Sequence, residues 1–541
     1  MKRVVWQAIA ALVGAVVVWV LVSLPPARTP IATTMPDRIV VGAYHIHTDR
    51  SDGSGSIDDV ARAAAEVGLQ FVILADHGTA TTPPEPPSYR HGVLVIDAVE
   101  VSSSDGHVVA LGLREASPYP LAGEGRDVIE DVHRMGGWTV AAHPDSQKAD
   151  LRWRGPATDG IEWINADSEW RDDGTQRKIQ AALHYLIRPA PAIASLFSRP
   201  RATLRRWDQW SRQRQVVGLA AVDAHARIGI DEQSEPRVAR TILARPSYAD
   251  MFRTLVQAVW LTRPLSGDAA TDADHILAAL RAAQTYSVVT AIAAPAVLTV
   301  TSTPSTMRAE VAGAPAAVVS IWHAGREVGS ARGAVEVALG AAGLYRVEVR
   351  WPEFDVPWIV SAPVFVPAPE ENPTPSPPVA PPGRAISLPP DGAWMAEHHQ
   401  ATTATRAGYD RGNRLVFTFA DTVIGQFAAL VHPLDPVEAF EEIRFTVRAD
   451  RPRRFSVQVR LPGPGEGERW VRSVYADTTP REVRVRLDTF EPADRQTSRR
   501  PIAARLQSLL FVVDEPHTVP GSSGQIEISA VSLQTPPTSG R

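Results

Sequence analysis

The N-terminal part of the chain carries a continuous apolar pattern that differs from everything after it. Val4 to Leu24 contains only two polar side chains, follows Lys2 and Arg3, and stops at Pro25. About 20 apolar residues are enough for a helix to cross a bilayer. No small-residue cleavage motif follows, so we favour an uncleaved signal anchor over a cleaved signal peptide. The positive-inside rule then predicts that the membrane is bound through residues 4–24 and that the rest of the protein lies outside the cytoplasm, periplasmic or on the cell surface.

Beyond residue 37, apolar runs alternate with amphipathic segments up to residue 292. Arg38 to Tyr44 has the composition of a strand, and Ile57 to Val67 has the period of a helix. Leu69 to Ala75 is apolar throughout, which is typical of a strand buried on both faces. Further strands are predicted at 138–142, 161–164 and 216–222, and a helix at 126–135. Strands separated by helices predict a parallel sheet, either open or closed as a barrel.

A longer insertion, residues 165–215, interrupts this alternation. Its apolar part, Ile179 to Phe197, is broken by Pro189 and Pro191. Helices packed over the sheet are the favoured interpretation; a lid, or a segment lying on the membrane surface, are the alternatives.

After residue 292 the helical period stops and short alternating strands follow. Val318 to Trp322 and Tyr345 to Trp351 alternate as half-buried strands do. Residues 367–383 hold eight prolines in seventeen positions, which is typical of an extended linker. The predicted organisation is therefore a signal anchor (1–25), a tether (26–37), an α/β domain (38–292), a small β-sandwich (293–366), the linker (367–383) and a β-sandwich or jelly roll (384–538).

Composition narrows the range of functions. The 541 residues are too many for one core and suggest about three domains. A net charge of −5, with no long basic run, does not favour tight nucleic-acid binding. The chain has no cysteine, so any metal site must use histidine and carboxylate ligands.

Histidines and acids gather where the predicted strands give way to loops. His45 and His47 are two residues apart, so a strand would direct both to one face. The nine candidate metal ligands are His45, His47, Asp52, His77, Glu100, His107, His143, Asp223 and His225. In α/β folds the carboxyl ends of parallel strands meet at one rim, where sites form. Six imidazoles and three carboxylates at one rim need cations, and this ligand set suits zinc, manganese or iron.

The motifs that hold these residues resemble those of the PHP (polymerase and histidinol phosphatase) superfamily. They are His45-x-His47-Thr48, Ser51-Asp52-Gly53, Asp76-His77, Glu100, Gly106-His107, Ala142-His143-Pro144 and Asp223-x-His225. The resemblance covers residues 38–292 and implies a distorted (β/α)7 barrel with two or three divalent ions. It implies a first ion on His45, His47, Glu100 and Asp223, a second on Glu100, His107 and His143, and a third on Asp52, His77 and His225. Aspartate at position 52 is closer to the branch with nucleotide and oligonucleotide phosphatases.

The resemblance implies a phosphoesterase, a phosphatase or phosphodiesterase, that acts on a phosphorylated small molecule or an oligonucleotide. Divalent ions lower the pKa of a bound water and neutralise phosphate oxygens. Arg227 and Lys148 are candidate phosphate clamps, with a surface role equally open. Glu162 and Asn165 are candidate partners of the ligands. Asp76 is a candidate for orienting His77, or else for shaping a turn.

A different class of function is a glycan- or envelope-binding protein whose barrel is only a metal-stabilised scaffold. Trp394, Trp470 and Tyr475 fall in the last β domain. Such aromatic residues stack on sugar rings in carbohydrate-binding jelly rolls, which this region loosely resembles. Ordinary core packing is the favoured interpretation of these residues.

Overall fold

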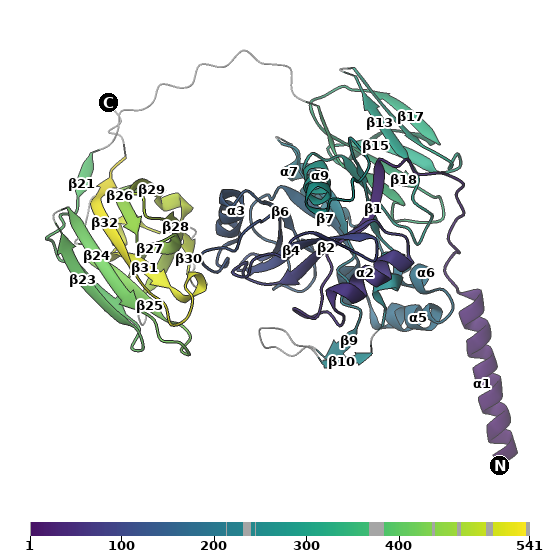
Figure 1. Ribbon diagram of the computed structural model, residues 1–541, viewed down its shortest axis with the longest axis horizontal. Coiled ribbons are helices and arrows are strands. Elements are labelled where there is room, and N and C mark those ends of the chain that lie inside the picture. Colours follow the sequence, from purple (N-terminus) through teal and green to yellow (C-terminus); the bar gives the residue numbers. More distant parts are fainter. Residues whose placement is uncertain are drawn as a thin grey trace. The chain divides into compact units, whose positions relative to one another are not determined.

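The computed structural model describes residues 2–212, 214–230, 240–243, 245–303, 305–366, 384–409, 411–434, 439–462, 467–493 and 501–536. The chain divides into two compact units (Figure 1). The first consists of residues 1–116 and 128–371, and the second of residues 117–127 and 372–541. The predicted linker, 367–383, lies outside the described residues.

Helix α1 (Lys2–Val22) forms where the apolar pattern predicts it (Figure 1). Its segment Arg3–Val22 has a mean hydropathy of 2.4 and is long and apolar enough to cross a membrane. Within it Val20 is buried, whereas the large apolar side chains from Val4 to Val22 are otherwise exposed. An apolar helix with so little protein around it could serve as a membrane anchor.

A mixed sheet forms the centre of the first unit. Its central strands are β1 (Ile39–Tyr44), β2 (Phe71–His77), β4 (Val93–Ser103), β5 (Gly106–Leu111), β6 (Trp138–Ala141), β7 (Gly160–Asn165), β8 (Val217–Ala221), β11 (Val256–Trp260) and β12 (Thr285–Val288). Their spatial order is β12-β11-β1-β2-β4-β5-β6-β7-β8, and β3 (Ser88–Arg90) pairs with β4.

The sheet is parallel only in part, which corrects the wholly parallel sheet that the sequence predicts. Strands β1, β2 and β4 run parallel, as do β6, β7 and β8. Strand β5 is antiparallel to both β4 and β6, and β11 is antiparallel to β1. Only residues 104–105 separate β4 from β5. A turn this short allows a hairpin, because a parallel crossover needs about a dozen residues.

Hydrogen bonds connect the chain after β8 to the chain after β1. The amide of Val222 donates to the Tyr44 carbonyl at 3.1 Å, and the amide of His47 donates to the Ala224 carbonyl at 3.1 Å. The two ends of the β1-to-β8 series therefore meet at the rim where the predicted ligands lie.

Helices border the sheet and supply the insertion. They are α2 (Ile57–Glu66), α3 (Gly125–Arg134), α4 (Ala166–Asp172), α5 (Thr175–Tyr185), α6 (Pro189–Ala194), α7 (Arg201–Trp210), α8 (Tyr248–Phe252) and α9 (Ala269–Arg281). Helix α2 begins with a capping box, in which Ser56 and Asp59 satisfy each other's backbone amides. Helix α7 packs Trp207 on β8 at Gly218, where a Cβ atom would lie 2.2 Å from the indole ring. Helices α5 and α6 lie side by side (Figure 1).

The rest of the first unit is β-structure. A separate sheet contains β13 (Leu298–Ser302), β14 (Thr306–Val311) and β17 (Ala334–Ala338). The strands β15 (Val318–His323), β16 (Arg326–Arg332), β18 (Gly343–Arg350), β19 (Ile359–Ser361) and β20 (Val364–Val366) extend the central sheet through β12. A two-stranded sheet joins β9 (Ile228–Ile230) to β10 (Arg240–Leu243). The predicted boundary at 292/293 thus falls within a region where hydrogen-bonded strands continue from one part to the next.

The second unit is a β-sandwich of two antiparallel sheets (Figure 1). One sheet contains β21 (Ala385–Ser387), β23 (Thr403–Tyr409), β24 (Gly412–Thr418), β26 (Glu442–Ala449), β29 (Arg481–Arg486) and β32 (Ser523–Gln534). The other contains β22 (Met395–His398), β25 (Phe427–Pro433), β27 (Arg453–Leu461), β28 (Glu468–Ala476), β30 (Glu491–Pro492) and β31 (Ser508–Asp514). Trp394 and Trp470 belong to the apolar core between them. Neither indole is therefore presented on the surface for stacking on a sugar.

Candidate metal centre

Three of the nine predicted ligands have left-handed backbone conformations at the ends of strands. The φ angles are +67° at His45, +29° at His143 and +46° at Asp223. Such a conformation is uncommon for residues other than glycine, costs about 1–3 kcal/mol, and is concentrated at functional sites. The chain leaves β1, β6 and β8 at these points, and the three side chains converge.

The loop after β1 is fixed by tertiary contacts. The His47 carbonyl accepts a hydrogen bond from the Tyr248 hydroxyl at 2.8 Å. Gly53 closes the turn, because a Cβ atom there would lie 2.2 Å from the His47 carbonyl oxygen. The loop places Asp52 Oδ1 3.3 Å from His47 Nδ1 and Asp52 Oδ2 3.2 Å from His225 Nε2.

Glu100 is the central residue of the cluster. Its Oε2 lies 3.2 Å from His45 Nε2, 3.3 Å from His47 Nε2 and 3.3 Å from His77 Nδ1, and its Oε1 lies 2.9 Å from His107 Nδ1 and 2.8 Å from His143 Nε2. Glu100 is inside β4 rather than at its end, opposite His77 on β2. Only 1% of the residue is exposed, so five imidazoles share one buried carboxylate.

The donor atoms form three overlapping groups that could each hold a metal ion. They are His47, Asp52, His77 and His225; His45, His47 and Asp223; and His77, Glu100 and His107, with the donor atoms of each group within 4.8 Å of one another. His143 contacts the last group through Glu100. His47 and His77 each belong to two groups, so adjacent ions would share ligands.

Hydrogen bonds made by the Nδ1 atoms of three histidines leave the Nε2 atom of each ring facing the cluster. The Nδ1–H group of His45 donates to Glu162 Oε1 at 2.6 Å, that of His143 to the Leu151 carbonyl at 3.1 Å, and that of His225 to the Asp223 carbonyl at 3.0 Å. Each ring therefore presents its Nε2 lone pair to the cluster. This is how outer partners prepare histidine for metal binding.

The donor set fits cations because several of its buried polar atoms make no hydrogen bond within the described part of the chain. Asp52 Oδ1, Asp223 Oδ1 and His77 Nδ1 are buried and have no hydrogen-bond partner among the described residues. Leaving a buried polar atom unsatisfied costs about 1–3 kcal/mol, and more for a charged group. A divalent ion between these atoms removes that cost, and nitrogen with carboxylate oxygen suits zinc, manganese or iron.

Burial and the neighbouring charges shift the pKa values of the cluster residues in opposite directions. Burial lowers the pKa of His47, but the Asp223, Glu100 and Asp52 carboxylates outweigh burial and raise that pKa to about 10. Burial lowers the pKa of His77 to about 3, despite the attraction of Glu100. Burial also raises the pKa of each carboxyl group, but the neighbouring imidazoles hold the pKa values of Asp52, Glu100 and Asp223 below their usual range. Protonation of the imidazoles alone therefore compensates the negative charge of the buried carboxylates poorly.

Glu162 and Asn165, predicted as partners of the ligands, contact them directly. Glu162 Oε2 accepts hydrogen bonds from the His143 amide at 2.8 Å and from Asn165 Nδ2 at 2.9 Å. The same Asn165 nitrogen donates to Asp223 Oδ2 at 3.0 Å. Together with the bond to His45, these contacts connect three ligands through two side chains.

Asp76 faces the loop after β1 and not the donor atoms. Its carboxylate accepts hydrogen bonds from the Thr48 amide at 2.7 Å, from Ser51 Oγ at 2.5 Å and from Arg50 at 2.8 Å. Burial alone would raise the pKa of Asp76, but these donors lower it overall. Arg50, which the sequence did not single out, also pairs with Asp97 at 2.6 Å. Asp76 thus accepts hydrogen bonds from the turn that carries Asp52.

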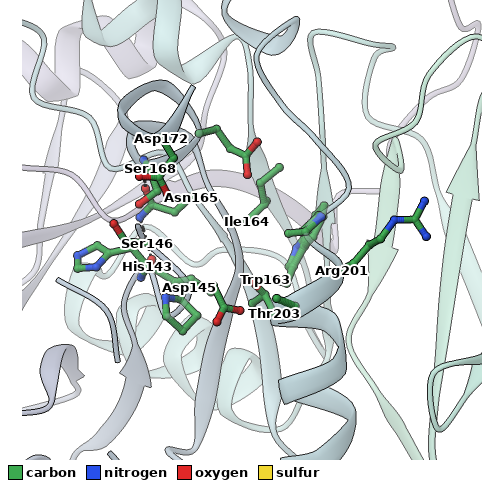
Figure 2. A pocket seen from close by; sticks show the side chains of 15 residues that line it. His143, Asp145, Ser146, Trp163, Ile164, Asn165, Ser168, Asp172, Arg201 and Thr203 are labelled. Atoms are coloured by element: carbon green, nitrogen blue, oxygen red, sulfur yellow. Dashed lines mark hydrogen bonds between the residues drawn. The ribbon is translucent and has the colours of Figure 1, made fainter. Parts of the chain in front are cut away.

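Within the described part of the chain, a smaller and a larger cavity adjoin the cluster. Figure 2 shows the smaller one, of about 190 Å³, with His143, Ser146 and Asn165 near one another and Arg201 extending away. The larger has a volume of about 860 Å³, and Asp223, His225 and Arg227 line it. Arg227 donates to Asp52 Oδ2 at 3.3 Å, so a candidate phosphate clamp touches a candidate ligand. Lys148, the other candidate, also lines this cavity.

The fold and the site define a class: a multidomain protein with an apolar N-terminal helix, a buried histidine–carboxylate cluster that could bind metal, and a C-terminal β-sandwich. No known protein-family profile matches the chain. The chain is 30% identical over 104 residues to a phosphoribosyl 1,2-cyclic phosphate 1,2-diphosphodiesterase of Eggerthella lenta. That match covers 18% of this chain and 39% of the enzyme, so well under half of the enzyme's length is represented.

Solved structures similar to part of the chain include carbohydrate-binding modules and an exo-β-agarase. A family 11 module of Clostridium thermocellum, in complex with a β-1,3-1,4-mixed-linked tetrasaccharide, is 16% identical; the alignment covers 28% of this chain and 95% of the module, with a TM-score of 0.22. Another carbohydrate-binding module of the β-sandwich superfamily is 11% identical, with coverages of 44% and 96% and a TM-score of 0.19. At these scores the likeness carries no argument about this chain.

Proposed function

We propose that this protein is a membrane-anchored, metal-dependent phosphoesterase of the PHP type. The observation that carries the proposal is the position of Glu100, whose two carboxylate oxygens face five imidazoles inside a buried cluster with unsatisfied polar atoms. The partial match to a phosphodiesterase supports the same chemistry.

The nine residues predicted from the sequence would hold two or three zinc, manganese or iron ions. When bound, such ions supply Lewis-acid stabilisation of phosphate oxygens and make a water more acidic. The protein groups hold the ligand rings in one tautomer, through Glu162 and backbone carbonyls, and keep the donors away from bulk water. Arg227 lies beside Asp52 and would bind a phosphate oxygen of the substrate.

The reaction is the addition of one water molecule to a phosphoester. The water oxygen forms a bond to phosphorus, the ester P–O bond breaks, and one water proton passes to the departing alcohol oxygen. Within the proposal, residues 38–292 form the (β/α)7 barrel, the segments 293–366 and 384–538 are accessory β domains, and α1 keeps the protein on the outer side of the membrane.

A direct test measures bound metal and phosphoester turnover on the same full-length sample. We expect zinc or manganese by elemental analysis, and metal-dependent release of p-nitrophenol from p-nitrophenyl phosphate or from bis(p-nitrophenyl) phosphate. The proposal is wrong if the metal-loaded protein turns over neither compound nor any member of a phosphoester panel.

His45→Ala and His143→Ala distinguish an enzyme from a metal-stabilised scaffold that binds glycans. If the protein is an enzyme, both variants lose turnover while circular dichroism shows a retained fold. If the barrel is a scaffold, the variants unfold and the wild-type protein has no turnover to lose.

A further inference from the structure

The larger cavity at the metal centre is lined by two chemically different sets of residues. One set consists of the candidate ligands Asp223 and His225, together with Arg227. Arg171 and Arg245 also line the cavity, but Asp167 and Asp250 in the same wall pair with them. Arg227, which lies 3.3 Å from Asp52, and Lys148 are the other cationic side chains of this lining, and bound metal ions would add positive charge for an anionic ligand.

The other set is mostly apolar and comes from the insertion. Helices α5 and α6 and the residues just after them contribute Ala181, Ala182, Leu186, Pro189, Ile193 and Leu196, together with Tyr185, whose hydroxyl donates to Asp250. Apart from Tyr185, none of these side chains can hydrogen-bond a sugar, a nucleobase or a second phosphate. A volume of about 860 Å³ far exceeds what a phosphate group alone needs.

The apolar set reaches the protein surface. Leu186 lines the cavity and is nevertheless 81% exposed, and the adjacent Ile187 is 48% exposed. Ile179, seven residues before Leu186 on the same helical face, is 58% exposed. Large apolar side chains grouped in this way mark a surface that contacts a membrane, a ligand or another protein.

This surface lies beside the end of the predicted membrane helix. Ser23, just after α1, is hydrogen-bonded through Oγ to His184 Nε2 at 3.0 Å. Arg188 donates to the Pro25 carbonyl at 2.7 Å. His184 and Arg188 flank Leu186 and Ile187, so the exposed apolar residues are adjacent to the C-terminal end of α1.

We propose that the substrate is an amphiphilic phosphoester of the membrane, a lipid phosphate whose head binds at the metal centre and whose apolar chain occupies the cavity beneath α5 and α6. This inference rests on the proposed function and specifies its substrate class. In this arrangement Leu186 and Ile187, which directly follow α5, lie in the membrane surface, and the lipid chain enters the cavity from the bilayer beside them.

The first test measures how turnover depends on chain length. The full-length protein in nanodiscs is loaded with metal and given n-alkyl phosphates and n-alkyl p-nitrophenyl phosphates, from ethyl to octyl. Each additional pair of buried methylene groups is expected to raise kcat/KM about tenfold until the cavity is full. Turnover with equal kcat/KM across the series overturns this inference and leaves the phosphoesterase proposal intact. Absence of turnover across the whole series overturns both.

The second test needs no activity. Nanodiscs containing phosphatidic acid with a photoreactive diazirine at the end of one acyl chain are irradiated with the metal-loaded protein, and cross-linked peptides are identified by mass spectrometry. We expect cross-links within residues 181–196. Ala182→Trp fills the cavity and should reduce this cross-linking at least severalfold, whereas the matched control Gln176→Trp, on the same helix but outside the cavity, should not. Cross-links confined to α1, or equal cross-linking in both variants, would overturn the inference.

Discussion

In a Glu162→Gln variant the side chain keeps its shape but loses one charge and one acceptor oxygen. The wild-type carboxylate accepts hydrogen bonds from His45 Nδ1 at 2.6 Å, the His143 amide at 2.8 Å and Asn165 Nδ2 at 2.9 Å. A glutamine side chain has only one acceptor oxygen, so it can accept either from His45 or from the His143 amide and Asn165, but not from both groups of donors. If its amide nitrogen faces His45, the ring must move its proton to Nε2, which blocks the nitrogen that faces the cluster.

If the amide nitrogen of the introduced glutamine turns the other way, it faces two donors, the His143 amide and Asn165. Either arrangement weakens a ligand. Outer partners of this kind contribute about 10- to 100-fold to metal affinity, which corresponds to about 1.4–2.7 kcal/mol. We therefore expect the metal Kd of the tightest site to rise about 10- to 100-fold in E162Q.

The assay is competition with a chromogenic chelator at constant pH, followed by elemental analysis after dialysis. Glu66→Gln is the matched control, because Glu66 pairs with Arg253 on the surface and its side chain is 62% exposed. E162Q with wild-type affinity and full metal content, and with a native circular dichroism spectrum, would refute the role assigned to Glu162.

Three further predictions concern stability, measured as the unfolding transition of the first unit in urea. Gly218→Ala should destabilise it by about 1–3 kcal/mol or more, because the new methyl group meets Trp207 at 2.2 Å; an unchanged midpoint would show that α7 can shift. Arg346→Met should cost about 3–5 kcal/mol, since the buried guanidinium pairs with Asp208 at 2.6 Å and its loss strands that carboxylate; a more stable variant would contradict this. Ser56→Ala should cost about 1 kcal/mol by removing the cap of α2, and faster amide exchange confined to residues 57–60 is the accompanying signature.

The sequence predicted the elements of the α/β region well because its strands are nearly pure apolar runs. The predicted strand at 138–142 and helix at 57–67 each match the observed element to within one residue. The strand directions were harder. A hairpin at residues 104–105 reverses β5, and local pattern does not reveal which neighbour a strand will pair with.

The candidate ligands could be found because histidine and acidic residues beside apolar runs are conspicuous. Their mutual arrangement could not, since Glu100 lies within β4 and meets His107 only through the β4–β5 register. Arg50 had no recognisable pattern, and only the folded loop brings it to Asp76. The roles of Trp394 and Trp470 could not be decided from the sequence, because an aromatic residue suits a core and a sugar-binding site equally well until its burial is known.

The place of Glu100 in the middle of a strand has a consequence for how the protein matures. A slip of one residue between β2 and β4 would turn the Glu100 side chain to the opposite face of the sheet and separate it from all five imidazoles. Ions that bind only the correctly paired sheet stabilise it by mass action. If the cluster binds the proposed ions, metal supply during folding should govern the yield of correctly folded protein as well as the proposed activity.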